Sequence, residues 1–375
     1  MSCAAVLLGG CSGFFDKTSD DDTGGDTGTG TGNYLYVANA GSNTVSGYQI
    51  STTGTLTAIT GTPVTVTDGT NKYAPTALTV TRNNRYLYVG TSQGIVGFKI
   101  GTAGVLSKVA DGQLLGGAVA SVTSLDTSPD GKWLIALYTD IAGTTLTVTA
   151  YTIASDGTIA PNVSGTPYGS TGVIVPHEVH ITPNASYIYA TAGLEGTLIY
   201  KFSTSSGIVT FQDRLKPVDG STGDISLAIS SDSSRLYLAR TGTTEGLTQY
   251  AIGSSGSLNR VGDRYTTGNQ PYSVLIDNSG KYVYVANRSD NTISGYVISS
   301  GGALTVAASS PYSAGDEVTA LGAESKGNWL IAVANSGTPD VTLYGFDSAT
   351  DEAGRIYTVG SANAGTTPMA LALTH

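Results

Sequence analysis

The sequence predicts an all-β fold, a seven-bladed β-propeller whose blades are four-stranded antiparallel sheets. Three observations predict it. A stretch that alternates large and β-branched residues, clearest at Tyr282 to Asn287, recurs at steps of 47 to 54 residues. A Gly-x-apolar turn recurs as often, and the two ends of the chain hold complementary parts of one unit. The seven stretches begin at Tyr34, Tyr86, Trp133, Tyr187, Arg235, Tyr282 and Trp329.

The composition suits such a fold and argues against nucleic acid as a partner. Of 375 residues, 50 are glycine and 22 tyrosine, and no long helical pattern interrupts the turn-dense sequence. The net charge is −10 and no basic cluster is present, so general binding to nucleic acid is not expected. Phosphate-binding glycine loops, nucleophile elbows and acidic calcium loops are absent from the sequence, so we expect no cofactor.

Residues 1–11 have the pattern of a signal segment. The only two cysteines are Cys3 and Cys11, so the propeller has no disulfide or thiolate metal site. The run Leu8 to Cys11 ends a short apolar segment and resembles the lipobox of bacterial lipoproteins, although no Lys or Arg precedes it. This predicts a membrane anchor through an acylated Cys11, which mass spectrometry would detect as the mature N-terminus. The alternative is an apolar leader without function.

Residues 12–32 are predicted to form a disordered acidic tether. Five aspartates lie among Gly, Ser and Thr, with almost nothing to bury. A flexible segment of this length has a root-mean-square reach of roughly 25 Å. The leader and the tether together predict a chain that is secreted across the inner membrane and lipid-anchored in the cell envelope. Ser12 after the cysteine favours the outer membrane or the cell surface.

Residues 33–375 form the predicted propeller. The best-defined unit has a first strand from Pro271 to Ile276, a second from Tyr282 to Asn287 and a third from Thr292 to Ile298. The Gly-x-apolar turn then leads into a fourth strand. Its seven glycines are Gly54, Gly104, Gly157, Gly207, Gly256, Gly302 and Gly354.

The chain ends predict that the ring is closed by the C-terminal strand. The first unit starts at its second strand, Asn33 to Ala38, and lacks a first strand. Pro368 to Leu373 repeats the first-strand pattern with nothing after it. Pairing the two would leave no free sheet edge at the seam.

Aligning the units predicts which residues face the central channel. One pore-facing column at the start of the first strands reads Thr76, Thr123, His177, Ile225, Tyr272, Thr319 and Met369. A second column, after the second strands, reads Asn39, Gly90, Tyr138, Thr191, Arg240, Asn287 and Ala334.

Four residues on neighbouring blades are candidate ligand-binding residues. His177, Arg240, Tyr272 and Arg288 would form a cationic spot that suits a small anionic ligand. The alternative is that the arginines are solvated and paired with acids such as Glu195, Glu245 or Asp290.

A metal shared by His177 and His180 is not expected, because their spacing puts them on opposite faces of a strand. His180 is then a packed or hydrogen-bonded strand residue, and tyrosines of the second strands fill the space between blades.

The repeated Pro-x-x-apolar-x-apolar strand, the turn Pro129 to Gly131 and the run Tyr284 to Asn287 resemble the lactonase-type seven-bladed propellers. That family includes bacterial 6-phosphogluconolactonase and carboxymuconate-lactonising propellers, and its repeat is also called the YVTN repeat. The resemblance implies that His177 matches the family's catalytic histidine and Arg288 its later arginine. The family's Arg-His pair is replaced by Ile225 and Ser226, and its glutamate by Thr241.

Three functions follow as hypotheses. The first is a cell-envelope propeller that binds a small anion or a protein partner. The alternative is a lactone hydrolase in which His177 is the base, with Arg240 and Arg288 holding substrate anions. A third is a structural subunit of a surface assembly.

Overall fold

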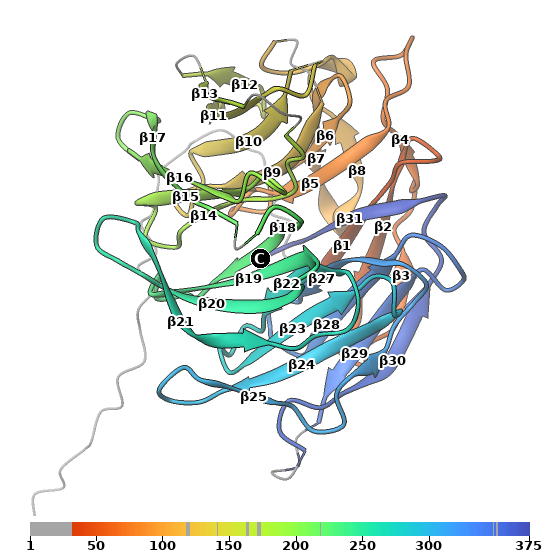
Figure 1. Ribbon diagram of the computed structural model, residues 1–375. Coiled ribbons are helices and arrows are strands. Elements are labelled where there is room, and N and C mark those ends of the chain that lie inside the picture. The colour runs from red at the N-terminus through yellow and green to blue at the C-terminus, as the bar shows by residue number, and fades with distance from the viewer. Residues whose placement is uncertain are drawn as a thin grey trace, which may run out of the picture.

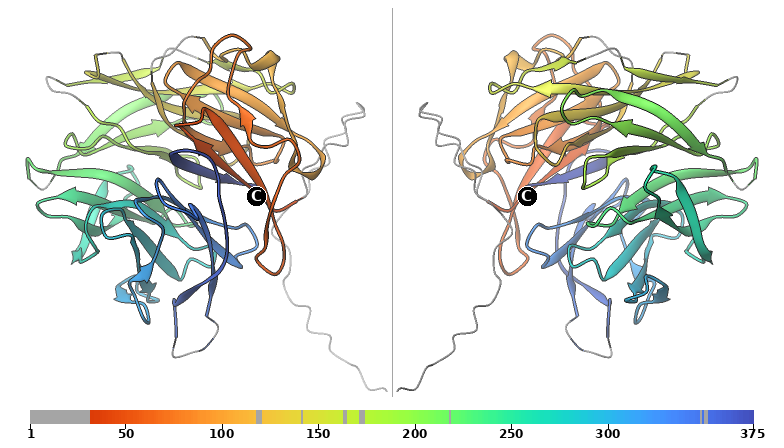
Figure 2. Two further views of the ribbon diagram at one scale, coloured as in Figure 1. Left: turned by 90° about the vertical axis from the view of Figure 1, so that its right-hand side faces the viewer. Right: turned by 90° about the vertical axis from the view of Figure 1, so that its left-hand side faces the viewer.

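The computed structural model describes residues 32–375 except 118–120, 141, 163–164, 171–173, 218, 348, 350 and 351. In this part of the chain, strands form seven antiparallel sheets around a central axis (Figure 1, Figure 2), which confirms the predicted propeller. Two short 3-10 turns, η1 (Thr102–Gly104) and η2 (Ala110–Gly112), accompany the strands. No helix among the described residues is long and apolar enough to cross a membrane. The predicted leader with Cys11, and the predicted tether except Gly32, lie outside the described residues.

Each blade consists of four strands in order from the channel outward. Three further strands pair with the third strands of blades one, three and six: β4 (Val64–Thr65), β13 (Thr166–Gly169) and β26 (Tyr312–Ser313). Blade one is β31 (Pro368–Leu373), β1 (Tyr34–Asn39), β2 (Thr44–Ile50) and β3 (Leu56–Ala58); blade two is β5 (Pro75–Val80), β6 (Tyr86–Thr91), β7 (Gly94–Ile100) and β8 (Leu106–Lys108). Blade three is β9 (Val122–Thr127), β10 (Trp133–Thr139), β11 (Thr145–Ile153) and β12 (Ile159–Pro161); blade four is β14 (Val179–Ile181), β15 (Tyr187–Thr191), β16 (Thr197–Phe202) and β17 (Val209–Leu215). Blade five is β18 (Thr222–Ile229), β19 (Arg235–Gly242), β20 (Gly246–Ile252) and β21 (Leu258–Tyr265); blade six is β22 (Pro271–Ile276), β23 (Tyr282–Asn287), β24 (Thr292–Ile298) and β25 (Leu304–Val306). Blade seven is β27 (Val318–Ala323), β28 (Trp329–Ala334), β29 (Val341–Phe346) and β30 (Ile356–Ala362).

The ring closes as the sequence predicts. All seven second strands begin at the predicted residue, from Tyr34 in β1 to Trp329 in β28. The C-terminal strand β31 pairs antiparallel with β1, so that Leu35 lies opposite Leu373. The backbone N–H of Tyr34 also donates a hydrogen bond to the Thr374 hydroxyl, 2.9 Å away. Blade one therefore combines the two ends of the described chain, and no sheet edge is left open at the seam.

Neighbouring blades interlock through the recurring glycine turn. Gly157 has a φ of +85°, and a Cβ there would lie 2.4 Å from the Tyr86 ring, so only glycine fits. The hydroxyl of Tyr88 donates to the Gly157 carbonyl oxygen at 2.9 Å. Second-strand aromatic residues thus fill the space between blades, as predicted. The seven contacts pair Gly104 with Tyr34, Gly157 with Tyr86, Gly207 with Trp133, Gly256 with Tyr187, Gly302 with Arg235, Gly354 with Tyr282, and Gly54 with Trp329.

A second set of inter-blade bonds runs around the channel. In blades three to six, the residue after the pore-facing position accepts a hydrogen bond from a backbone N–H of the next blade. Three of these acceptors are serine hydroxyls, and the fourth is the carboxylate of Glu178. The channel wall is therefore held in register by side chains as well as by sheet packing. The donor and acceptor pairs are Val179 to Ser124, Leu227 to Glu178, Val274 to Ser226, and Leu321 to Ser273.

Candidate functional site

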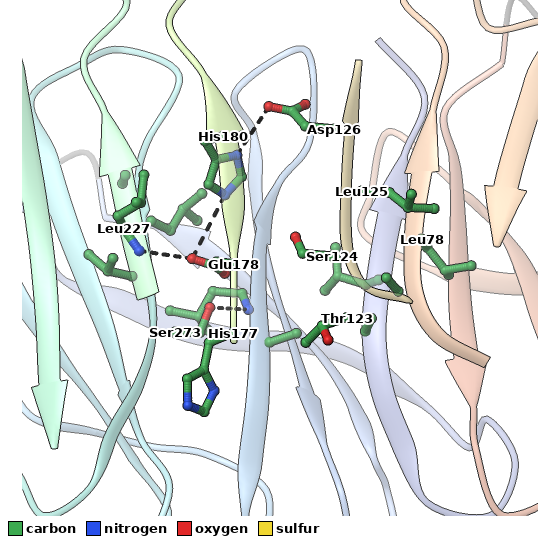
Figure 3. Close-up of a pocket in the computed structure, with 18 of the residues that line it drawn as sticks. Leu78, Thr123, Ser124, Leu125, Asp126, His177, Glu178, His180, Leu227 and Ser273 are labelled. Carbon is green, nitrogen blue, oxygen red and sulfur yellow. Dashed lines mark hydrogen bonds and ion pairs between the residues drawn. The ribbon is translucent and has the colours of Figure 1, made fainter. Parts of the chain in front are cut away.

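The innermost strands enclose a central channel of about 650 Å³. Figure 3 shows side chains of several blades directed into it. All residues of the first predicted column line this channel, which confirms the alignment of the repeats: Thr76, Thr123, His177, Ile225, Tyr272, Thr319 and Met369.

The second predicted column lies inside the blades, which corrects the predicted role of Arg240. Its side chain is only 2% exposed, and its Nε donates to Asp224 Oδ1 at 2.7 Å. Its Nη2 donates to the Tyr250 hydroxyl at 2.8 Å. Asp224, fully buried, also accepts a hydrogen bond from the Thr197 hydroxyl of blade four. Arg240 therefore joins two blades and does not reach a ligand at the channel mouth.

Backbone bonds fix the position of His177 at the mouth. It precedes β14 and donates its backbone N–H to the Thr191 carbonyl oxygen at 3.0 Å. The buried Thr191 hydroxyl accepts from the Glu178 N–H at 2.9 Å and donates to the Ile225 carbonyl oxygen at 2.8 Å. One threonine thus anchors the pore-facing residues of blades four and five.

The imidazole of His177 packs against the ring of Tyr272. The two rings meet edge to face, with centroids 6.3 Å apart and an interplanar angle of 85°. Burial lowers the pKa of His177 to about 4 because the charged form loses hydration. Among the described residues, no hydrogen bond of this ring to another side chain or carbonyl is found. At neutral pH the ring is uncharged and has a nitrogen that can accept a proton.

Arg288 completes a cluster at the mouth with His177, Tyr272 and Glu317, which we call the mouth cluster. The guanidinium carbon of Arg288 lies 5.0 Å from the Tyr272 ring centroid, a cation–π contact. Its Nη2 donates to Glu317 Oε2 at 2.9 Å. Hydrogen bonds from Asn335 and Arg288 lower the pKa of Glu317, so this carboxylate is ionised at neutral pH. Three of the four predicted residues therefore come together, with an acid that the sequence did not suggest as partner.

A second cluster lies farther along the channel wall, where the chain continues from His177 into β14 (Figure 3). His180 Nδ1 lies 3.3 Å from Asp126 Oδ2, and its Nε2 lies 3.8 Å from Glu178 Oε2. Asp126 also accepts the Ile181 backbone N–H at 3.0 Å. Burial alone would lower the pKa of His180, but the hydrogen bond and charge of Asp126, with the charge of Glu178, raise it to about 9. We call Asp126, Glu178 and His180 the inner cluster; at neutral pH its histidine is an imidazolium.

The inner cluster was only partly foreseen. His180 is a hydrogen-bonded strand residue as predicted, but the expectation that it faces away from His177 is wrong, since both line the channel. His177 precedes the strand, so strand alternation does not apply to it. Asp126 stands three residues after its blade's pore-facing position, as His180 does, and that shared offset could have identified it. Among the described residues, no group of three metal-ligating side chains could hold a metal ion.

Replacing His180 by Gln is expected to destabilise the protein at pH 6, and this difference should shrink as the pH rises through about 9. The folded-state pKa lies above the unfolded value of about 6.5. The stabilisation is therefore complete below pH 6.5 and is lost as His180 deprotonates. Because the side chain is 39% exposed to the channel, solvent screening limits the effect to about 1 kcal/mol. Urea unfolding of both proteins between about pH 5 and pH 10 measures it.

His177→Gln is the matched control for this experiment. The pKa of His177 is lowered to about 4, so its pH-dependent stability is present above the unfolded pKa and is lost as the pH falls through about 4. The assigned ion pairs would be contradicted if the difference in unfolding free energy between the wild type and His180→Gln changes only in this acid range, or does not change with pH.

Comparisons with known proteins agree with the fold. A family model described as "Lactonase, 7-bladed beta-propeller" matches residues 64–358. A search of the curated proteins finds no match. Among solved structures, the periplasmic gluconolactonase PpgL of Pseudomonas aeruginosa is similar with a TM-score of 0.72 and 17% identity, over 92% of this chain and 99% of that chain.

Two further structures show how widely the architecture is shared. A candidate 6-phosphogluconolactonase from Bacteroides uniformis has a TM-score of 0.73 and 14% identity, over 91% of this chain and 99% of that chain. The hydrazine synthase of Kuenenia stuttgartiensis has a TM-score of 0.60 and 15% identity, over 88% of this chain and 98% of that chain. At these identities the likeness concerns the fold, and an activity must be argued from the side chains at the channel mouth.

Proposed function

The chain belongs to the family of seven-bladed β-propeller lactonases, and we propose that it hydrolyses a lactone at the mouth of its central channel. The observation that carries this proposal is His177, an uncharged imidazole that lines the channel with a ring nitrogen free to accept a proton. Similarity to a periplasmic gluconolactonase adds support. The family favours the lactone hydrolase, which the sequence suggested as the alternative, over a binding module.

His177 has the properties of a general base for this reaction. It would accept a proton from a water molecule whose oxygen attacks the lactone carbonyl carbon. The ring C–O bond then breaks, and the protonated His177 returns the proton to the leaving alkoxide oxygen. The product is an open-chain hydroxy acid, so atoms and charge balance with water as the only other reactant.

The neighbours of His177 would orient the substrate. Tyr272 packs edge to face against the imidazole. Its hydroxyl would donate a hydrogen bond to the carbonyl oxygen of the lactone. Arg288 contacts the Tyr272 ring through a cation–π interaction, and Glu317 is in turn paired with Arg288. These contacts preorganise the mouth cluster before a substrate arrives.

The experiment that tests the proposal is lactone hydrolysis by the wild type and by His177→Gln. Loss of the base is expected to lower kcat/KM by a factor of about 10² to 10⁴. The wild-type kcat/KM should rise with pH through about 4 and then stay level to pH 7, because the base is active only when unprotonated. Stopped-flow or pH-indicator assays over that range measure both results.

His180→Gln is the matched control, since it removes the other channel-wall imidazole outside the mouth cluster and should change kcat/KM only a few-fold. If His177→Gln keeps wild-type activity, His177 is not the base. If the wild type hydrolyses no sugar, alkyl or carboxylated lactone, the proposed function is wrong. The predicted anchor at Cys11 and the predicted envelope location remain separate proposals, based on the leader alone.

A further inference from the structure

The seven residues of the pore-facing column carry no charge at neutral pH. The pore-facing column contains three threonines, one isoleucine, one methionine, one tyrosine and the uncharged His177. Two of the threonine hydroxyls are occupied by the wall: Thr76 donates to the Val122 carbonyl oxygen at 2.5 Å, and Thr319 donates to the Pro368 carbonyl oxygen at 3.4 Å. The column is therefore uncharged, and two of its three threonine hydroxyls are already hydrogen-bonded to the channel wall.

The two arginines that the sequence suggested as anion-binding residues are already compensated. The carboxylate of Glu317 binds Arg288, and the carboxylate of Asp224 binds the buried Arg240. The acidic side chain of Glu178 lies between His177 and His180 along the channel wall (Figure 3). On a chain with a net charge of −10, a phosphate or carboxylate at this mouth would meet no uncompensated positive partner among these residues.

Two exposed apolar side chains lie on blade four beside blade five. Val175, two residues before His177, is 51% exposed, and Leu194 is 60% exposed. Both flank Gly193, where a Cβ would lie 3.1 Å from the Val175 carbonyl oxygen. Gly193 also forms a β-bridge with Asp224, the neighbour of Ile225. Val175 and Leu194 thus lie close to the strand that carries Ile225, and we call these three residues the apolar rim.

We propose that the substrate is an uncharged lactone that carries a hydrocarbon substituent, and not a phosphorylated or carboxylated lactone. The lactone ring would sit beside His177 and Tyr272, and the substituent would pack on the apolar rim. This inference rests on the proposed function, because it names the substrate class of the same site. It replaces the small anionic ligand that the sequence suggested.

The test compares kcat/KM across lactones that differ in charge and in hydrocarbon content. δ-Hexalactone, δ-octalactone and δ-decalactone lengthen the alkyl chain in steps of two methylenes. Each methylene that is buried should raise kcat/KM by up to about fourfold. Glucono-δ-lactone is the polar uncharged substrate, and 6-phosphoglucono-δ-lactone the anionic one. We expect δ-decalactone to be hydrolysed best and the phosphorylated lactone worst.

Two variants separate charge from packing. Ile225→Arg should raise kcat/KM for the phosphorylated lactone by about tenfold and lower it for δ-decalactone, because it places an uncompensated cation at the mouth. Leu194→Ser should flatten the dependence on chain length, and it alters an exposed residue, so the fold should persist. Val306→Ser is the control, because Val306 is exposed on β25, the outermost strand of blade six, and this variant should keep the wild-type ranking. Thermal unfolding by circular dichroism checks that each variant is folded.

The outcomes distinguish the inference from the proposed function. Hydrolysis of the phosphorylated lactone faster than δ-decalactone by the wild type would overturn the inference while leaving the lactonase assignment intact. Equal rates for all three alkyl lactones would also overturn it. If no lactone is hydrolysed, the proposed function fails, and the inference fails with it.

Discussion

Replacing Asp224 by Ala is expected to lower the free energy of unfolding by about 3–5 kcal/mol. The change leaves the guanidinium of Arg240, only 2% exposed, without its carboxylate partner in a site that water cannot reach. It also removes the acceptor of the Thr197 hydroxyl, which links blade five to blade four. Urea or guanidinium unfolding at pH 7, followed by circular dichroism, measures the loss.

An exposed ion pair of the same chain provides the control. Glu317→Ala removes the partner of Arg288, but the glutamate is 50% exposed, so solvent screening should leave only a small loss of stability. A double variant, Asp224→Ala with Arg240→Met, should be less destabilised than the sum of its single variants, because neither charge is then left unpaired. If Asp224→Ala costs no more than Glu317→Ala, the buried pair does not hold the two blades together.

The architecture could be predicted because every blade meets the same two packing requirements. Side chains of its second strand fill the space to the next blade, and the glycine turn of that next blade passes close to the first of these side chains. The alternation that begins at Tyr86 and the glycine at Gly157 satisfy these two needs and recur in every unit. Repetition at a fixed step therefore located the strands, and the complementary ends located the closure.

The chemistry of the channel was harder to predict because it depends on contacts between blades. The repeat alignment placed Arg240 just after the second strand, whereas it lies within β19. The alignment also could not tell that the second column faces the blade interior. Only the approach of Asp224 from the neighbouring strand explains a buried arginine at that position. The bond between Asp126 and His180 likewise joins residues of different blades, so only a comparison of offsets between the repeats could have indicated it.

Sequence similarity and the contacts in the structure favour ligands of different charge. A histidine and an arginine at family positions favour an anionic substrate, yet in the structure the arginine is bound by Glu317. An ion pair that forms through a loop of the next blade changes what the site can bind without changing the family motif. Whether a charged side chain at the mouth of a propeller is available to a ligand must therefore be judged from its ion pairs in the structure.

Removing residues 368–375 is expected to abolish the folded monomer. These residues include β31, which pairs with β1, and Leu371 and Leu373 pack against the apolar cluster shared by blades one and seven. Without β31, the backbone groups of β1 lose their hydrogen-bond partners, and a sheet edge opens inside the ring. The net stability of folded domains is only about 5–15 kcal/mol. The loss of an innermost strand should therefore leave an aggregating chain with no cooperative thermal transition.

A shorter truncation and a peptide test this closure directly. Deleting His375 alone keeps β31 and should preserve the thermal transition. A synthetic peptide of residues 366–375, added to the truncated chain during refolding, should restore a monomeric propeller in size-exclusion chromatography, because the vacant position beside β1 accepts a strand of that sequence. If the truncated chain is monomeric and unfolds at the wild-type temperature without the peptide, then β31 covers blade one without closing the ring.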